Sequence, residues 1–351
     1  MQLKKSTINN IICYGIVIVA FIICQLMINA GSMPRTLKGQ LILICVYIVM
    51  AVSLNLVVGI SGELSLGHAG FMSVGAFSAA IFSAWLLATF KIESTIVRLI
   101  LSMLAGGVCA GIAGVLIGVP VLRLRGDYLA IVTLAFGEII RSVLNCLYFS
   151  IEGSRLHVSF NNPTLPGDML VNGPAGAKVV EKLSTFPMGF ALILFTLFVV
   201  LNLINSRSGR AIMATRDNRI AAEAMGINVT KYKMMAFVTA AVLAGMAGAL
   251  YGLNSSTVDP AKFKFDTSIL VLVFVVLGGI GNIWGSIIAA TLLTVLPEIL
   301  RAFSDYRMLV YAIVLILVML ATNNPFIRSL FDRLIHPGKS LSQAQRGGAS
   351  E

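Results

Sequence analysis

The sequence predicts an all-α, polytopic bundle of transmembrane helices. Its residues are 58% hydrophobic and only 12% charged, and the mean hydropathy is +0.92. Ordinary soluble domains are roughly 45–50% apolar. The apolar residues form continuous runs of about 20 residues, the length of helix that crosses a bilayer. Continuous runs favour helices over the period-two alternation of a membrane β-barrel.

Ten apolar runs are predicted spans, some of them broken by glycine. The first follows Lys4 and Lys5 and is longer than the apolar core of a signal peptide, so we expect an uncleaved span. The eighth and ninth are separated only by "GGIGNIWG", so two short helices and one broken helix both remain open. The ten runs are 11–30, 40–60, 66–89, 98–119, 128–149, 187–205, 233–254, 267–279, 284–300 and 308–322.

The connectors predict an orientation. With residues 1–10 inside, 14 Lys and Arg residues fall in inner segments and 11 in outer ones. The connector at 206–232 and its flanks contribute six of the inner charges, which favours cytoplasmic termini under the positive-inside rule. The long connector at about 150–186 is rich in Asn, Pro and Gly and is expected outside. The transmembrane domain then covers 11–325, and the polar tail 326–351 is expected to be cytoplasmic and disordered.

Several classes of function are disfavoured. The net charge of +11 is spread over span ends rather than clustered, so we expect no nucleic-acid partner. The five cysteines lie in apolar runs without a C-x-x-C pair, and no catalytic triad, paired carboxylates or metal-ligand spacing is present. The "GKS" near the C-terminus lacks the earlier glycine of a phosphate-binding loop. We therefore expect neither enzyme activity nor a bound cofactor or metal on this chain.

Two glycine-rich interruptions are candidates for a translocation pathway. Unwound backbone at membrane depth is tolerated only against protein or a water-filled cavity, and helix N-termini there can hold an anion. Ionisable side chains beside the first interruption strengthen this interpretation, although a short cytoplasmic turn with a solvated glutamate is the alternative. The candidate pathway residues are Gly59, Gly62, Glu63, His68, Gly279 and Gly281.

Two opposite charges lie within the fifth predicted span. Glu138 and Arg141 are three residues apart, so they share one helical face and can pair. Neither is stable facing lipid alone. The sequence leaves open whether they neutralise each other within the bundle or contact a substrate.

The stretch "RDNRIAAEAMG" predicts a short helix in the inner connector. Asp217 or Asn218 is a suitable N-cap, and Gly226 is a suitable residue just beyond the C-terminus. Ile220, Ala224 and Met225 form a small apolar face, which suits docking to a protein partner or shallow contact with lipid headgroups.

The similar segments "VCAGIAGVLIG" and "VLAGMAGALYG", beginning at Val108 and Val242, permit two explanations. One is an inverted repeat. The other is the small-residue spacing that recurs wherever membrane helices pack closely.

Four motifs in order resemble the permease subunits of bacterial branched-chain amino-acid ABC importers, most closely the M-type subunit. They are "SGELSLGHAGF", "RLRGDYLAIVTLAFGEIIR", "GRAIMATRDNRIAAEAMGINVTKYKMMAFVTAAVLAGMAGALYG" and "VLVFVVLGGIGNIWG". The resemblance covers residues 40 to 325. The outer connector departs from the pattern, with "NGPAGAK" where the family often has a run like "TGGPNG".

The resemblance implies partners that the residues alone do not. These are a homologous second permease, two cytoplasmic ATPases that bind ATP and Mg, an extracytoplasmic binding protein, and a branched-chain amino acid crossing the bacterial inner membrane. It also implies that residues 211–229 hold a coupling helix that docks on an ATPase. The implied contacts are Arg216, Asp217, Arg219, Glu223 and Gly226.

Other functions stay open. Similar permeases carry urea or other small amides, and the chain by itself also fits a stand-alone secondary transporter or channel. A membrane scaffold or enzyme subunit without a transport path is a further possibility.

Overall fold

A computed structural model describes residues 5–30, 35–124, 126–153, 155–160 and 165–300, with six helical residues between 309 and 316. The chain divides into two compact units, Met1–Val295 and Leu296–Glu351. The second unit is described only at the end of helix α11 and at those six residues. The tenth predicted span and the predicted disordered tail therefore lie almost entirely outside the described residues.

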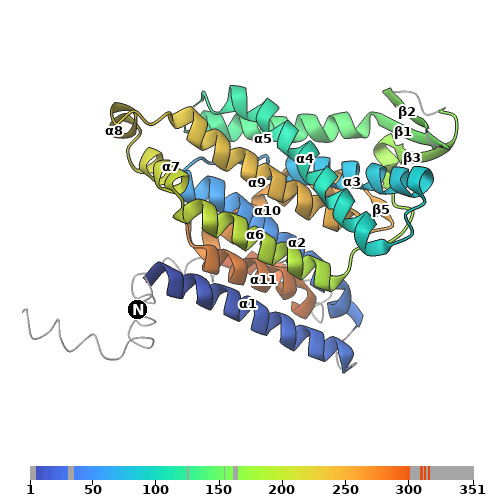
Figure 1. Cartoon of the computed structure of the whole chain (residues 1–351), viewed down its shortest axis with the longest axis horizontal. Coiled ribbons are helices and arrows are strands. Elements are labelled where there is room, and N and C mark those ends of the chain that lie inside the picture. Colours follow the sequence, from blue (N-terminus) through green and yellow to red (C-terminus); the bar gives the residue numbers. More distant parts are fainter. Residues whose placement is uncertain are drawn as a thin grey trace, which may run out of the picture. The chain divides into compact units, whose positions relative to one another are not determined.

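The described part is mostly helical (Figure 1). In chain order the α-helices are α1 (Lys5–Asn29), α2 (Arg35–Asn55), α3 (His68–Phe90), α4 (Thr95–Val121), α5 (Asp127–Asn145), α6 (Phe186–Asn205), α7 (Arg207–Asp217), α8 (Arg219–Ala224), α9 (Val229–Gly252), α10 (Phe265–Gly278) and α11 (Ile283–Ile299). A π-helix, η1 (Leu56–Ile60), extends α2, and two 3-10 turns are η2 (Gly173–Ala175) and η3 (Pro260–Phe263).

Five of the described helical segments are long and apolar enough to cross a membrane. They are Gly39–Ile60, His68–Phe90, Thr95–Val121, Phe186–Asn205 and Val229–Gly252. Shorter apolar helices cover Val17–Ile28, Phe265–Gly278 and Ile283–Ile299. The eighth and ninth predicted spans are thus two separate helices of 14 and 17 residues, α10 and α11.

A five-stranded antiparallel sheet corrects the prediction of an all-α fold. Its order is β2-β1-β3-β4-β5, and its strands are β1 (Leu147–Glu152), β2 (Arg155–Phe160), β3 (Asp168–Asn172), β4 (Ala177–Lys178) and β5 (Thr257–Val258). The fifth predicted span runs past Asn145, where α5 ends. Residues Leu147–Glu152, "LYFSIE", are rich in aromatic and β-branched side chains and form β1, which pairs with two neighbouring strands. The described part of the predicted outer loop therefore contains β2, β3, β4 and the end of β1.

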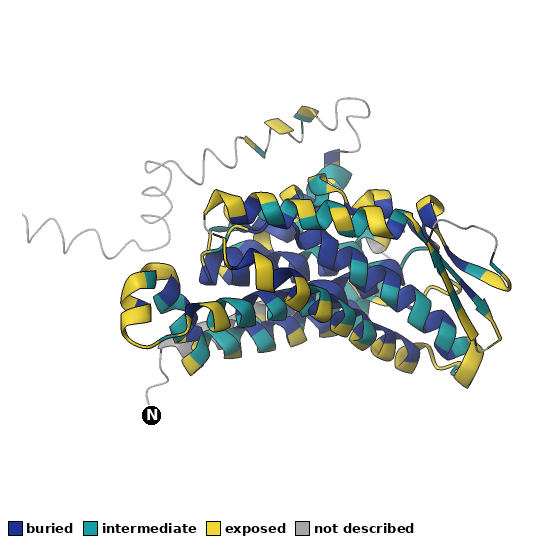
Figure 2. Cartoon of the chain, turned by 90° about the horizontal axis from the view of Figure 1, so that it is seen from above, coloured by how far each residue is buried: buried dark blue, intermediate teal, exposed yellow. Residues whose placement is uncertain are grey.

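The core lies where α3, α4 and α9 pack against one another, with α2 also against α9. Figure 2 shows buried residues gathered in the interior of the helical bundle and exposed residues on its outer faces. The outer face of α4 exposes Leu104, Val108, Ile112 and Leu116, each half exposed or more. An apolar stripe at a spacing of four residues suits contact with lipid or with another membrane helix.

The two similar segments face each other in this core. A Cβ on Gly107 meets Met246, one on Gly111 meets Val242, and one on Gly114 meets Ala241, so α4 and α9 run antiparallel. Absent side chains let the two backbones approach closely. This contact is a physical reason for small residues in both segments.

The sheet and the α7–α8 segment lie at opposite ends of the first unit (Figure 1). Four of the six candidate pathway residues lie at the α7–α8 end, next to Arg216 or Lys233: Gly59, Gly62, Glu63 and Gly281.

Candidate functional site

The first interruption is a change in helix type followed by extended backbone. Ser61 N donates to Leu56 O at 3.1 Å, the five-residue step of a π-helix, and α3 resumes only at His68. Gly62 has a φ of +76°, a conformation that costs little only for glycine. π-helical turns leave backbone groups available and often occur at functional sites.

The second interruption is a tight turn between α10 and α11. Gly279 and Gly281 have φ values of +92° and +83°. A Cβ on Gly285 would lie 1.6 Å from Gly278 O, so the chain folds back on itself with no space for a side chain.

Asn55 connects the two interruptions. Gly281 N donates to Asn55 Oδ1 at 2.8 Å, and Asn55 Nδ2 donates to Ser286 Oγ at 2.9 Å. The Asn55 side chain is fully buried. The gap between Gly59 and Gly281 is so narrow that a Cβ on Gly59 would lie 2.3 Å from Gly281 N. The structure therefore brings Gly59 and Gly281 together.

Sequence reasoning missed Asn55. Its signal was an amide inside the apolar run "VMAVSLNLVVG", one helical turn before the glycine. A polar side chain in such a run needs a partner, and it found one 226 residues away.

Arg216, at the end of α7, reaches back to the first interruption. Its Nη1 donates to Gly59 O at 2.7 Å, and its other nitrogens contact Asp217 Oδ1 at 3.1 and 3.2 Å. Its Cγ also occupies the space where a side chain at Gly62 would lie, 2.5 Å from the Cβ position. Arg216 thus joins the α7–α8 segment to backbone at the π-helix.

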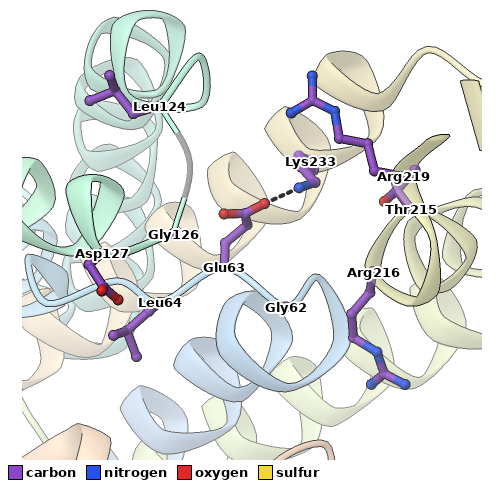
Figure 3. A pocket seen from close by; sticks show the side chains of 10 residues that line it. All are labelled: Gly62, Glu63, Leu64, Leu124, Gly126, Asp127, Thr215, Arg216, Arg219 and Lys233. Atoms are coloured by element: carbon purple, nitrogen blue, oxygen red, sulfur yellow. Dashed lines mark hydrogen bonds and ion pairs between the residues drawn. The ribbon is translucent and has the colours of Figure 1, made fainter.

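A pocket of about 330 Å³ opens beside this contact (Figure 3). Its lining includes Glu63, Asp127, Arg216, Arg219 and Lys233. Lys233 Nζ forms an ion pair with Glu63 Oε1, and each of these two side chains is only 12% exposed. Glu63 is therefore not the freely solvated turn residue that one interpretation expected.

His68 does not line this pocket. It is 2% exposed, and its Nε2 lies 2.8 Å from Ser53 Oγ between α2 and α3. Its edge also meets the Phe71 ring, with centroids 6.2 Å apart. These contacts are those of a packed core residue.

Local rules explain the α7–α8 segment. Ser206 Oγ accepts from Gly209 N at 3.1 Å to cap α7, and Asn218 Oδ1 accepts from Ala221 N at 3.0 Å to cap α8. Gly226 follows α8 with a φ of +78°. Arg219 Nε pairs with Glu223 Oε1 at 2.9 Å.

The apolar side chains of α8 point outward. Ile220 is 80% exposed and Met225 is 82% exposed, whereas Ala222 is buried against the rest of the chain. Large apolar side chains with this exposure on a capped helix favour a partner surface.

Glu138 and Arg141 lie away from the pocket, on α5. Arg141 Nε donates to Glu138 Oε2 at 2.7 Å, so the two side chains pair along the helix. Glu138 Oε1 also accepts from Phe265 N at 3.2 Å, at the first residue of α10. Glu138 therefore ties α5 to α10.

In the described ranges, no group of three His, Cys, Asp or Glu side chains is placed to hold a metal ion.

Comparison with known proteins identifies relatives over most of the chain. The family model for "Branched-chain amino acid transport system / permease component" matches residues 36–319. The high-affinity branched-chain amino acid transport system permease protein LivM of Salmonella typhimurium is 32% identical over 349 residues, which covers 90% of this chain and 74% of the relative. LivM of Escherichia coli is 34% identical, over 78% of this chain and 66% of the relative.

A second kind of permease is also similar. LivH of Salmonella typhimurium is 26% identical over 280 residues, which covers 78% of this chain and 88% of the relative. No solved structure matches. The match across residues 36–319 and the identity to LivM show that this chain belongs to the permease components of branched-chain amino acid transport systems.

Proposed function

We propose that this chain is the membrane-spanning permease subunit of an ATP-driven importer that moves branched-chain amino acids across the inner membrane. The main support for this proposal is the α7–α8 segment. It exposes Ile220 and Met225 on its surface, and its Arg216 donates a hydrogen bond to Gly59 O at 2.7 Å. An exposed docking surface is thereby connected to the backbone of two interrupted helices. This connection is what transmission from an ATPase to a translocation pathway requires.

The proposal includes partners and an orientation. The α7–α8 end faces the cytoplasm and two ATPases, which bind ATP and Mg, and the sheet faces a binding protein outside. Six basic residues between Ser206 and Lys233 support this orientation. Similarity to both LivM and LivH supports pairing with a homologous second permease. Both termini are then cytoplasmic.

The coupling residues have two different roles in this proposal. Asp217, Arg219, Glu223 and Gly226 shape or border the α8 surface that meets the ATPase. Arg216 instead transmits movement inward, because its guanidinium is hydrogen-bonded to Gly59 O. The glycines of the two interruptions and the Glu63–Lys233 pair form the cytoplasmic part of the pathway.

Competition uptake tests the cargo. A strain lacking the chain, complemented with it, should take up radiolabelled leucine in a vanadate-sensitive manner, with competition by isoleucine and valine but not by urea. Competition by urea alone would assign a small-amide importer. Uptake that persists without any ATPase would refute the ATP-driven mechanism and favour a secondary transporter or channel.

Two substitutions test the coupling helix. Gly226→Pro removes the positive φ of +78°, and Glu223→Lys breaks the 2.9 Å pair with Arg219. Both variants should reach the membrane normally yet lose leucine uptake per ATP hydrolysed. Normal transport by both would leave α8 without a coupling role.

Substitutions in the two interruptions test the pathway. Gly62→Leu and Gly281→Leu introduce side chains at positive φ, where Arg216 or the Gly59 backbone already lies nearby. Normal folding with wild-type transport in both variants would place the pathway elsewhere.

A further inference from the structure

The last two turns of α5 carry a polar stripe that the pocket does not explain. Glu138, Arg141, Ser142 and Asn145 recur at steps of three and four residues, so they share one face of the helix. Asn145 ends α5, and β1 begins at Leu147. The stripe therefore runs toward the sheet end of the unit.

Glu138 has both carboxylate oxygens engaged. Oε2 accepts from Arg141 Nε at 2.7 Å, and Oε1 accepts from Phe265 N at 3.2 Å. The positive end of the α10 dipole adds to the stabilisation of this carboxylate. Glu138 is thus a positioning residue that holds the arginine from its Nε side.

The terminal nitrogens of Arg141 remain open. Nη1 and Nη2 form no hydrogen bond with any residue in the described part of the chain, and the side chain is 25% exposed. A guanidinium has five N–H donors, and its planar fork suits bidentate binding of a carboxylate. Glu138 uses one donor and leaves the fork available.

Exposure of the Glu138 and Arg141 side chains to lipid would be energetically unfavourable. Glu138 is 34% exposed beside Arg141 on α5, the helix of the fifth predicted span. Charged side chains within the membrane typically face the bundle interior, a partner or a water-filled cavity. A polar stripe on α5, next to helices with apolar outer faces, favours a water-filled path along this side of the bundle.

We propose that the Arg141 fork binds the carboxylate of the amino acid in transit, near the outer mouth of the pathway, with Glu138 positioning it. This inference rests on the proposed function, because it requires a cargo with a carboxylate. Arg141 lies about one helical turn from the end of α5 at the sheet, the side from which the proposed binding protein delivers cargo. A carboxylate bound there uses the open Nη1 and Nη2 donors without displacing Glu138 from Nε.

Transport by the assembled importer in proteoliposomes, with leucine-loaded binding protein outside, tests the site. Arg141→Gln should reduce leucine uptake per ATP hydrolysed about tenfold to a hundredfold, the usual scale for losing hydrogen bonds between charged groups. Arg141→Lys, which keeps the charge but loses the fork, should be intermediate. Stimulation of ATP hydrolysis by the binding protein should persist in both. Arg123→Gln, at an exposed arginine in the α4–α5 connection, is the matched control.

The outcomes separate this inference from the proposed function. If wild-type importer shows no ATP-dependent leucine uptake, the proposed function fails before any variant is measured. If wild type transports and Arg141→Gln has unchanged uptake per ATP, the carboxylate site is refuted. A proportional loss of hydrolysis and uptake also refutes it, because that pattern is expected of a purely structural ion pair.

Water accessibility gives a second test that does not depend on transport by the variant. In a chain with its five cysteines replaced, Arg141→Cys should react with a charged methanethiosulfonate reagent added outside. Ile139→Cys is the control, because Ile139 lies at a similar depth and is 54% exposed on another face of α5. A thiol at position 141 that does not react, or that reacts no faster than the thiol at position 139, would refute a water-filled site at Arg141.

Discussion

Replacement of Gly59 by alanine should separate the two interruptions. The added Cβ would lie 2.0 Å from Asn55 Oδ1, 2.3 Å from Gly281 N and 2.6 Å from Gly281 Cα. Two of these three atoms are backbone, so the clash is not relieved by rotating a side chain. The structure must open, and the 2.8 Å bond from Gly281 N to Asn55 Oδ1 is lost.

The magnitude follows from two contributions. Overpacking costs about 1–3 kcal/mol, and the lost hydrogen bond adds about 1 kcal/mol. We therefore expect Gly59→Ala to lower the free energy of unfolding by about 2–4 kcal/mol. Transport should also fall, because Arg216 binds the same residue's carbonyl.

Gly39→Ala provides the matched control. Gly39 lies in α2, the helix that η1 extends, and a Cβ there meets nothing within 4 Å. Since alanine is the better helix former, this variant should be neutral or slightly stabilised, by up to about 1 kcal/mol. Thermal melting of the detergent-solubilised chain compares the two. Equal melting temperatures for Gly59→Ala and wild type would refute the close approach of the interruptions.

Three further predictions concern the α7–α8 end. Arg216→Lys should keep the charge but lose the directed bond to Gly59 O, so leucine uptake per ATP should fall several-fold while ATPase co-purification is retained. Glu63→Gln or Lys233→Gln alone should lower the free energy of unfolding by about 3–5 kcal/mol, because each leaves a largely buried charge unpaired. If the double variant lost as much stability as the two single variants together, the pairing would be contradicted. Ile220→Glu or Met225→Glu should leave the melting temperature unchanged, since both side chains are at least 80% exposed, but should abolish ATPase co-purification; retained binding by both would exclude the α8 surface as the docking site.

Local patterns predicted much of the structure. Apolar runs located the helices that became α2, α3, α4, α6 and α9. Asn218 and Gly226 border α8 as predicted, because caps depend on residues within one turn of the helix end. The same reasoning extended α5 too far and missed the sheet. Its strands are short, and they come from two connectors, one before α6 and one after α9.

The sequence by itself therefore determined the membrane class, the positions of most helices and the two glycine interruptions. Only the tertiary structure decided which residues those interruptions contact. Arg216 binds backbone 157 residues away, Lys233 pairs across 170 residues, and Asn55 joins segments 226 residues apart. Helix periodicity and capping act within a few residues, whereas these contacts depend on which helices pack side by side. That is why the sequence predicted Arg216 only as a contact of the coupling helix, whereas in the structure it also binds the backbone at Gly59.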